Sequence, residues 1–405
     1  MNDRPGVVVT GWGAVSAWGW GAAPLGRALF GGDTAIAPFT RFDHAGYETH
    51  VAGEAPDPPD GSEPAAWRRL SWAERFALAA GREAAAQARL PERLGDARAG
   101  VFFGSSTGGM LEAEEFYKRW RGRCLERAPR APLVAHRVSA PADAVARSLG
   151  VTGPVETVSS ACASGTLALG LAQRALADGR VDVALTGGAD SLCRITFGGF
   201  NALRSVAAEP CRPFRADRTG LSLGEGAAVL VLEREETARA RGARVLGRLL
   251  GAGAAADSHH MTAPHPEGRG AALAVERALT AAGVERERVD FINAHGTGTD
   301  LNDVAEYRGL HAVFGERVGT IPLTSTKGSV GHLLGSAGSI EAVATLIALA
   351  EQRLQPTPGD GEVDPEAPVR LVRRAEPASI GVALSLSLGF GGCNAAAVLA
   401  PGDRA

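Results

Sequence analysis

The sequence predicts an α/β fold built from two similar halves, and two observations lead to this prediction. Short β-branched runs alternate with segments rich in Ala and Leu, an alternation typical of strands and helices that pack in layers. The clearest runs are residues 7–10, 99–103, 181–186 and 227–232. The same order of parts then recurs later in the chain, which is the pattern that internal duplication produces.

The repeat begins with a helix, a strand and a polar loop. A helix predicted over residues 77–88 is followed by a strand that ends in the loop of residues 104–109. In the second half, a helix predicted over residues 271–282 is followed by a strand that ends in the loop of residues 295–299. Because strand-end loops form binding sites in α/β proteins, both loops are candidates for functional sites.

The later parts of the halves also correspond. Residues 155–176 match residues 321–349, and residues 224–230 resemble residues 391–399. We therefore predict two halves, residues 1–245 and 246–405. Two stretches fit neither half, residues 33–65 and 111–138, and both are predicted to be insertions. The Pro-rich residues 355–368 are predicted to be a surface loop that joins the last helix to the final strands.

Composition argues against several classes of protein. The chain has 405 residues, of which 45% are hydrophobic, so it can bury a large core. Its net charge of −3 disfavours nucleic-acid binding, which usually requires a basic excess. The N-terminus lacks a secretory signal pattern, and no apolar run approaches the roughly 18 residues of a membrane span. We expect a cytoplasmic protein with neither a nucleic-acid nor a membrane partner.

Cys162 is the candidate nucleophile. The five cysteines are widely spaced and form no CxxC pair, so we expect free thiols rather than disulfides or a zinc site. Cys162 lies between a β-branched run and a predicted helix beginning near Thr166. Amide groups at the helix N-terminus favour the thiolate over the thiol and could bind an oxyanion. A small buried structural cysteine is the alternative.

A second group of polar residues could stabilise negative charge. His295 closes a strand predicted over residues 289–294 and precedes two Gly-Thr pairs. Lys327 and His332 lie in a glycine-rich stretch that leads into another predicted helix. Two imidazoles and a cation suit a site that donates hydrogen bonds to a developing enolate. A structural histidine and a solvated lysine are the alternatives for single residues.

Together these motifs resemble the β-ketoacyl synthase family, in particular its elongating Cys-His-His members, over nearly the whole chain. The motifs are SSACASG around Cys162, NAHGTGTDLND around His295, STKGSVGHLLGSAGSIEA around Lys327 and His332, and GFGG at residues 389–392. Their occurrence in order makes a chance match very improbable. The resemblance implies the thiolase-like fold, in which two α/β halves form an α-β-α-β-α layered core.

The resemblance also implies a decarboxylative Claisen condensation of malonyl-acyl-carrier protein with an acyl chain held on Cys162. His295 and His332 would polarise the malonyl thioester, and Lys327 would orient the two histidines. The further roles that it implies are an oxyanion hole from the amides of Cys162 and Phe390, a gate at Phe390, an acyl-channel mouth at Thr107, phosphopantetheine contacts at Thr262, Thr297 and Thr299, and a supporting buried acid at Glu341. No permanent cofactor and no metal are implied.

Two features of the chain bear on its loops and partners. The family pattern places acids where this chain has Arg215 and Thr219, which leaves Arg218 without an expected partner. The segment of residues 118–130 is rich in basic side chains, which predicts either a solvated helix face or a docking surface for an acidic acyl-carrier protein. The basic residues are Lys118, Arg119, Arg121, Arg123, Arg127 and Arg130.

Other assignments remain open on the sequence alone. A thiolase would use a second cysteine, and Cys393 is the candidate. A chain-length-factor-like subunit would shape the acyl tunnel of a catalytic partner, but such subunits typically lack the nucleophile that Cys162 provides. Family members pair, so we expect a homodimer or a heterodimer with a chain-length factor. The pathway, fatty-acid or polyketide, is undetermined.

Overall fold

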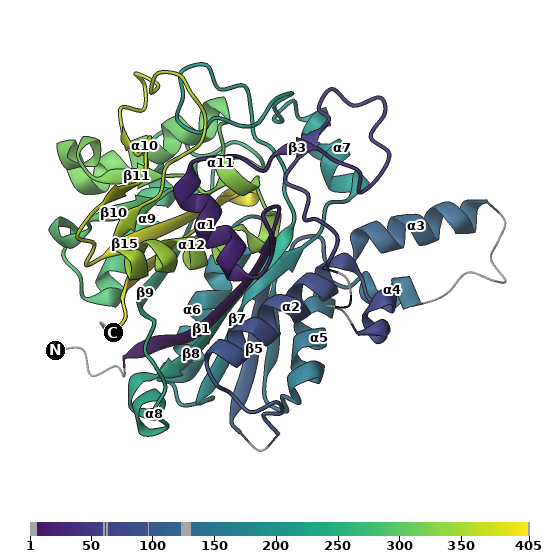
Figure 1. The fold of residues 1–405 in the computed structure, drawn as a ribbon. Helices are drawn as coiled ribbons and strands as arrows, with labels where there is room; N and C mark the ends of the chain where they lie inside the picture. Colours follow the sequence, from purple (N-terminus) through teal and green to yellow (C-terminus); the bar gives the residue numbers. More distant parts are fainter. Residues whose placement is uncertain (1–5, 60, 62–63, 96, 123–130, 404–405) are drawn as a thin grey trace.

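The computed structural model describes residues 6–59, 61, 64–95, 97–122 and 131–403, and most of its strands join one mixed sheet (Figure 1). The strand order is β13-β11-β10-β15-β16-β9-β1-β8-β7-β5-β6, with β2 (Gly19–Trp20) paired to β1. The bounds are β1 Val7–Ser16, β5 Ala99–Gly104, β6 Val155–Val158, β7 Val183–Asp190, β8 Gly226–Arg234, β9 Gly247–Ala256, β10 Phe291–Asn293, β11 Pro322–Thr324, β13 Arg370–Leu371, β15 Ala383–Gly389 and β16 Cys393–Pro401.

The sheet repeats one pattern on each side of the β1–β9 pair. Strands β8, β7, β5 and β6 follow β1 outward, and β16, β15, β10 and β11 follow β9 in the matching order. Each half combines parallel pairs at its outer end with antiparallel pairs next to the centre. Within the described part of the sheet, the strands of the two halves pair where residues 7–9 meet residues 247–249. The duplication is therefore confirmed, while the exact boundary at residues 245 and 246 stays a prediction.

Helices complete five layers. Helices α2 and α5 cover the outer face of the first half, α9 and α10 cover that of the second, and α6 and α12 lie between the half-sheets (Figure 1). The helix bounds are α1 Ala22–Gly31, α2 Trp72–Gln87, α3 Met110–Arg121, α4 Ala131–Ala135, α5 Ala140–Leu149, α6 Ser164–Ala177, α7 Arg194–Ala202, α8 Glu235–Ala240, α9 Arg269–Ala282, α10 Asp300–Phe314, α11 Lys327–Val330 and α12 Ala337–Glu351. This is the predicted α-β-α-β-α arrangement.

The central helices explain why the most apolar segment of the chain lies inside the protein. Among the described residues, Leu334–Glu351 is long and apolar enough to cross a membrane, but 89% of it is buried within the protein. A helix that is apolar on every side needs a partner on every side, and the two half-sheets and α6 supply them. The segment is a core helix.

Small residues let α6 and α12 meet at their N-termini. A Cβ atom on Gly165 would lie 2.5 Å from Ser339 Oγ, and one on Gly338 would lie 2.1 Å from Thr166 Oγ1. Neither distance is sterically possible, so only glycine allows this approach. As a result, the residues just before both helices are brought to the same place.

The two predicted insertions lie outside the layers. Residues 33–65 contain a short hairpin of β3 (Ala37–Pro38) and β4 (Val51–Ala52). Residues 111–138 form most of α3 and α4, and α3 projects from the body (Figure 1). Of the basic residues predicted in this segment, Lys118, Arg119 and Arg121 are exposed on α3. Cys124, Arg123, Arg127 and Arg130 lie outside the described residues.

The prediction of a surface loop at residues 355–368 is wrong for its first part. Residues 355–358 are buried, and only the later residues reach the surface. The Thr357 hydroxyl accepts a hydrogen bond from the Ser325 amide (2.9 Å), and the Gln355 amide group donates to the Ala344 carbonyl. Prolines at 356 and 358 carry no N–H group, which reduces the number of donors that must be satisfied inside.

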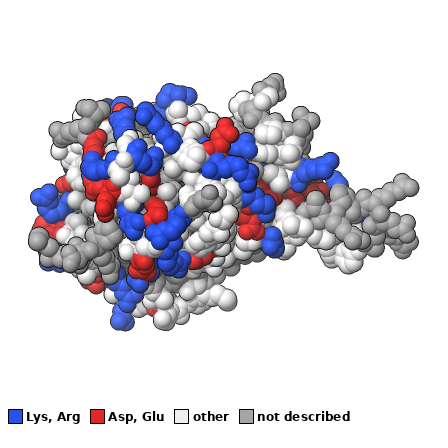
Figure 2. All heavy atoms as spheres, turned by 90° about the horizontal axis from the view of Figure 1, so that it is seen from below, with Lys and Arg blue, Asp and Glu red and all other residues white. Residues whose placement is uncertain are grey.

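Positive and negative side chains are interspersed over the face drawn in Figure 2. Arg239 pairs with Glu235 (2.7 Å) and Asp403 (2.9 Å). Arg98 pairs with Asp182 at 2.8 Å. The face shown there therefore lacks the single-sign field that binds a phosphate backbone.

Candidate active site

Cys162 lies immediately before helix α6, as predicted. It follows β6 and a short turn in which Ala161 has a φ of +47°, a conformation that costs energy for a residue with a side chain. The turn is held by Ser164, whose hydroxyl donates to the Ala161 carbonyl (2.6 Å) and accepts from the Ser160 amide (2.8 Å). Cys162 is 6% exposed, so its thiol faces the interior end of a pocket.

The two histidines meet Cys162 from the other half of the chain. One side-chain donor atom of each of Cys162, His295 and His332 lies within 4.8 Å of the other two. The imidazole rings are 5.3 Å apart between centroids and nearly perpendicular, at 85°. His295 follows β10 and His332 precedes α12, so the duplicated architecture brings residues from three distant segments together.

Hydrogen bonds determine which nitrogen of each histidine carries the proton. Lys327 Nζ lies 3.0 Å from His295 Nδ1, and the Leu334 amide donates to His332 Nδ1 at 3.2 Å. An ammonium group and an amide N–H can only donate, so each Nδ1 must accept. The proton of each neutral ring is therefore on Nε2. Both rings present an N–H donor toward the space beside Cys162.

Both imidazoles are neutral at physiological pH. Burial lowers the pKa of His295 well below its usual value, and the charge of Lys327 and the neighbouring His332 add to this effect. Burial, followed by the charge of Lys327, likewise lowers the pKa of His332 well below its usual value. Protonation would place further positive charge beside a buried ammonium. The site can therefore donate hydrogen bonds without changing its protonation state.

Lys327 is the buried cation of the site. Its ammonium group, 1% exposed, also donates to the His295 carbonyl and forms an ion pair with Glu341. Burial raises the pKa of Glu341 to about 7, while the charge and hydrogen bond of Lys327 act in the opposite direction. The resemblance implied a buried acid at Glu341 facing the site. The structure places it behind Lys327, where it fixes the ammonium.

The structure does not support the expectation that Cys162 rests as a thiolate. Burial raises the pKa of the Cys162 thiol to about 11, against the lowering effects of Lys327 and of the amides of Phe390 and Cys162 itself. Loss of solvent therefore outweighs the helix N-terminus. Because these two amides act on the thiol, they lie close enough to it to be candidates for binding the carbonyl oxygen of a thioester formed at Cys162.

Alkylation of Cys162 by iodoacetamide is expected to accelerate about tenfold per pH unit between about pH 7 and pH 9, without a plateau. The reason is that the thiolate fraction grows tenfold per unit below the thiol pKa. Mass spectrometry of the Cys162 peptide measures the rate, with the peptide that contains Cys393 as internal reference. A plateau below pH 8 would show that the thiolate is the resting form.

The loops of the site are held by buried carboxylates that accept hydrogen bonds from the backbone amides of the loops. The sequence analysis did not predict these acids as site residues. Glu306 accepts from the amides of His295 (2.6 Å) and Gly296 (2.8 Å), and Asp303 accepts from the Thr297 amide (3.0 Å). Asp190 accepts from three amides in the loop of residues 104–109. Asp303 lies within the NAHGTGTDLND motif, but a carboxylate's contacts to backbone amides leave no pattern in the sequence.

A pocket of about 290 Å³ leads from the surface to Cys162. Its lining includes most of the predicted site residues: Cys162, Thr262, His295, Thr297, Thr299, His332 and Phe390. Thr107 is not in this lining. It is 3% exposed, and its hydroxyl bonds Asp190 (3.0 Å) and the Ser191 carbonyl (3.2 Å). The structure therefore brings the thiol, the imidazoles and the predicted pantetheine threonines together, with Thr107 behind them.

Phe390, which the resemblance predicts to be a gate, lies in the turn between β15 and β16. Its ring stacks on Phe200 of α7 at a centroid distance of 5.4 Å, and Gly391 has a φ of +79°, which glycine adopts without strain. Gly392 and Asn394 line the pocket, whereas Cys393 does not. Because neighbouring residues in a strand point to opposite faces, Cys393 is directed away from Cys162.

Arg218 has several hydrogen-bond and ion-pair partners, even though Arg215 and Thr219 stand nearby in place of the acids of the family pattern. Arg218 forms an ion pair with Asp364 and donates to the carbonyls of Thr299 (3.1 Å) and Asp300 (3.0 Å). Arg215 donates to the carbonyl of Gly359 (2.7 Å). The acid that the sequence lacks at Thr219 is thus supplied from residue 364, far along the chain.

The donor set of the site does not favour a metal. Cys162, His295 and His332 are close enough to surround an ion. However, each Nδ1 already accepts a hydrogen bond, so each Nε2 carries a proton rather than a free lone pair. The adjacent histidines His259 and His260, in the loop after β9, are no better suited to a metal, because His260 Nδ1 accepts from the amides of Thr262 and Ala263, both at 3.1 Å.

Comparison with known proteins identifies two family matches in succession. Residues 4–238 match the model of the beta-ketoacyl synthase N-terminal domain, and residues 246–359 match that of its C-terminal domain. A Streptomyces halstedii protein named as a polyketide beta-ketoacyl synthase 1 is 39% identical to this chain, and the match covers 98% of this chain and 98% of that protein. The 3-oxoacyl-[acyl-carrier-protein] synthase 2 of Staphylococcus aureus (strain COL) is 34% identical over 98% of this chain and 99% of its own.

Solved structures agree with these matches. The ishigamide ketosynthase/chain length factor structure superposes with a TM-score of 0.93 at 34% identity, covering 98% of this chain and 99% of that chain. A second is AntDE:AntF, described as a type II PKS acyl-carrier protein in complex with its ketosynthase bound to the hexaketide. It has a TM-score of 0.90 at 27% identity and covers 99% of this chain and 100% of that chain.

Proposed function

The chain belongs to the β-ketoacyl synthase family, and on this premise we propose that Cys162 carries the acyl chain while His295 and His332 activate the incoming malonyl thioester. The chain is an acyltransferase that condenses acyl thioesters held on an acyl-carrier protein. The observation that carries the assignment of residues is that the Cys162 thiol and a ring nitrogen of each neutral histidine lie within 4.8 Å of one another at the end of one pocket.

In the first half-reaction, the Cys162 sulfur attacks the carbonyl carbon of an acyl-carrier-protein thioester. The amides of Cys162 and Phe390 stabilise the oxyanion that forms. The pantetheine sulfur then leaves and takes up the proton that the Cys162 thiol releases. Because one thioester is exchanged for another, the step needs no external base beyond this transfer.

In the second half-reaction, the malonyl carboxylate leaves as CO2 and its bonding electrons move onto the thioester oxygen. The Nε2–H groups of His295 and His332 donate to this oxygen and stabilise the enolate. The enolate carbon attacks the acyl carbonyl on Cys162, and the Cys162 thiolate leaves. Its high pKa favours recovery of a proton from solvent, which returns the enzyme to its starting state.

Thr262, Thr297 and Thr299 are proposed to bind the phosphopantetheine arm. All three line the pocket between the surface and Cys162. Thr297 and Thr299 share a hydroxyl–hydroxyl contact of 2.8 Å, so one hydroxyl is available to the amide groups of the arm. The arm is a transient occupant, and we propose that the enzyme holds no permanent cofactor. We place the reaction in the cytoplasm.

Two observations favour a catalytic subunit over a thiolase or a tunnel-shaping subunit. Cys162, His295, Lys327 and His332 are all present and in contact, and Cys393 points away from the pocket. Structures similar to this chain include ketosynthases paired with chain length factors. We propose that this chain fills the ketosynthase position of such a pair or of a homodimer.

Intact-mass spectrometry tests the proposal directly. The protein is incubated with an acyl-carrier-protein thioester and then with malonyl-carrier protein. We expect an acyl adduct that the second substrate discharges as a β-ketoacyl product. His332→Ala should form the adduct but discharge it at least about 10²-fold more slowly, since one enolate donor is lost. Absence of any adduct, with every carrier and primer tested, would assign the chain to the tunnel-shaping class.

Replacement of Thr107 by phenylalanine is expected to lower acylation by long chains more than tenfold while short chains are affected less. The loop that carries Thr107 contacts the nucleophile turn, because the Ser106 hydroxyl donates to the Ala161 carbonyl (3.2 Å). Thr107 itself lies outside the pocket lining, and we propose that the larger phenylalanine ring extends from this buried position toward Cys162. Rates with acetyl- and octanoyl-carrier protein measure the effect, with Thr107→Ser as control. Equal losses for both chains would remove Thr107 from the acyl channel.

A further inference from the structure

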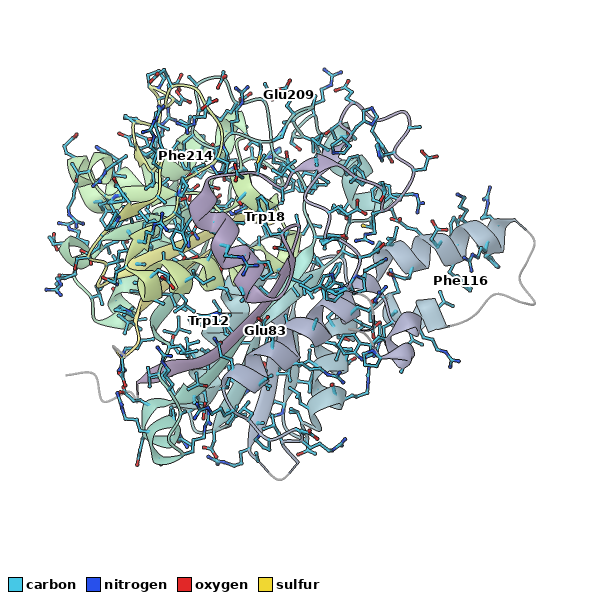
Figure 3. All side chains as sticks on the ribbon, viewed as in Figure 1. Trp12, Trp18, Glu83, Phe116, Glu209 and Phe214 are labelled. Carbon is cyan, nitrogen blue, oxygen red and sulfur yellow. The ribbon has the colours of Figure 1, made fainter. Side chains whose placement is uncertain are left out.

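The insertion of residues 33–65 brings two histidines together outside the catalytic pocket. His44 lies between β3 and β4, and His50 lies immediately before β4. Their Nδ1 atoms are 2.8 Å apart, and the centroids of their rings are 5.0 Å apart. Figure 3 shows the loop between β3 and β4 well apart from Phe214, which packs against Gly296 in the loop that follows β10. The two histidines therefore form a separate group, and neither is among the described residues that line the catalytic pocket.

A backbone hydrogen bond determines which nitrogen of His44 is available to a ligand. His44 Nε2 lies 3.0 Å from the Phe39 carbonyl oxygen, which can only accept, so Nε2 carries the proton of the neutral ring. His44 Nδ1 then presents a lone pair toward His50 Nδ1. The His44 ring is also stacked on the Phe39 ring, with centroids 4.2 Å apart. Histidines that bind metals commonly donate their second nitrogen to a carbonyl in this way, because the bond fixes the tautomer and the ring orientation.

The separation of the two Nδ1 atoms suits a single metal ion. Two nitrogens bound to one ion at about 2.0–2.1 Å lie about 2.9 Å apart when the angle between the bonds is 90°, and about 3.3 Å apart when the angle is tetrahedral. The observed 2.8 Å is closer to the first value. Nitrogen ligands at right angles are typical of tetragonal Cu²⁺ and Ni²⁺ sites. His44, His50 and Asp43 line one surface hollow of about 410 Å³, which leaves room for water ligands.

We propose that His44 and His50 bind a divalent transition-metal ion, Cu²⁺ or Ni²⁺, through their Nδ1 atoms. Water molecules complete the coordination, and the Asp43 carboxylate in the same hollow contributes negative charge. Without an ion, a hydrogen bond between the two neutral rings requires His50 to carry its proton on Nδ1. When the ion binds, this proton moves to Nε2 of His50, so both Nδ1 lone pairs become ligands.

The position of the histidines gives the ion a structural role. The rings of Phe39 and Phe42, from the same insertion, pack on Phe197 of α7 at centroid distances of 5.0 Å and 5.6 Å. An ion that joins the two histidines therefore stabilises the loop that covers α7. This helix also carries Phe200, which lines the catalytic pocket. The ion is thus a structural ligand of the insertion and takes no part in the condensation chemistry.

Titration calorimetry with Ni²⁺ at neutral pH tests this inference on protein without a polyhistidine tag. The variants are His44→Gln and His50→Gln, each made singly. The matched control is His259→Gln with His265→Gln, because these rings are also close, at 5.2 Å between centroids, but His265 Nδ1 already accepts from the Glu267 amide (3.2 Å). Cys162→Ala serves as a second control, since Cys162 lies in the other group of side chains close enough to surround an ion.

We expect wild type to bind one Ni²⁺ at this site, and each single variant to bind it at least about tenfold more weakly, because one of two protein ligands is lost. Both controls should bind within about twofold of wild type. Zn²⁺, which prefers tetrahedral ligands, should bind more weakly than Ni²⁺. Saturating Ni²⁺ should raise the Tm of wild type and leave that of His50→Gln unchanged, since an ion that binds only the folded state stabilises it.

Three results would overturn the inference. No Ni²⁺ binding by wild type would mean that the two rings form a hydrogen bond only. Equally tight binding by both histidine variants would mean that the ion binds elsewhere on the surface, and a loss of binding in Cys162→Ala alone would place it at the catalytic group. None of these measurements uses acyl transfer, so each result leaves the proposed function to its own test.

Discussion

Replacing Cys162 by alanine is expected to abolish the acyl adduct and reduce condensation by more than about 10⁴-fold, as is usual when a nucleophile is removed. Among the described residues that line the pocket, Cys162 is the one cysteine, and only a thiol can form a thioester. The substitution removes a single buried atom, so the free energy of unfolding should fall by only about 1 kcal/mol.

The two half-reactions of Cys162→Ala are measured separately. Intact mass after incubation with an acyl-carrier-protein thioester reports the first half-reaction, and release of labelled CO2 from malonyl-carrier protein reports the second. Cys393→Ala is the matched control, since Cys393 is the second cysteine of the thiolase alternative and lies outside the pocket lining. An adduct on Cys162→Ala, or loss of activity in Cys393→Ala, would contradict the assignment.

Replacing Lys327 by methionine is expected to damage both catalysis and stability. The variant loses the donor to His295 Nδ1, so the His295 proton is no longer confined to Nε2, and condensation should fall about 10²- to 10³-fold. It also leaves Glu341 buried without its cation, and breaking a buried ion pair in this way costs about 3–5 kcal/mol. Urea unfolding and the rate of condensation measure the two effects separately.

A second substitution separates these two roles of Lys327. Lys327→Met combined with Glu341→Leu removes both charges and should recover much of the stability, while condensation stays low because His295 still lacks its donor. Recovery of activity together with stability would show that Lys327 acts only through the fold. That result would remove it from the group of residues that position the histidines.

The single Lys327→Met variant should also show a pH dependence of a particular sign. Burial already raises the pKa of Glu341 to about 7, and loss of Lys327 removes the charge that opposes this rise. Above the ordinary pKa of a glutamate, the folded state then holds a proton that the unfolded state has released. Stability of the variant should therefore fall further as pH rises from 6 to 8, with the double variant as the control that does not show this dependence.

The sequence alone was sufficient to predict the duplicated α/β fold and the four central residues of the site. Strand and helix patterns are local, and the two halves use them in the same order, so the repeat was visible before any contact was known. Cys162, His295, Lys327 and His332 lie in glycine-rich motifs of fixed spacing, which makes them recognisable as a set. The structure places these four residues in one site, and their catalytic roles remain the proposal tested above.

The protonation states and the supporting contacts were decided only by the tertiary structure. Arg218 pairs with Asp364, 146 residues away, and the amides of His295 and Gly296 bind Glu306, contacts that leave no local pattern. The helix N-terminus predicted a thiolate at Cys162, but desolvation raises the pKa of this thiol to about 11. Spacing in a sequence determines which groups are available. Burial and long-range packing determine their charge, because the solvent that would stabilise a charge is lost only when the chain folds.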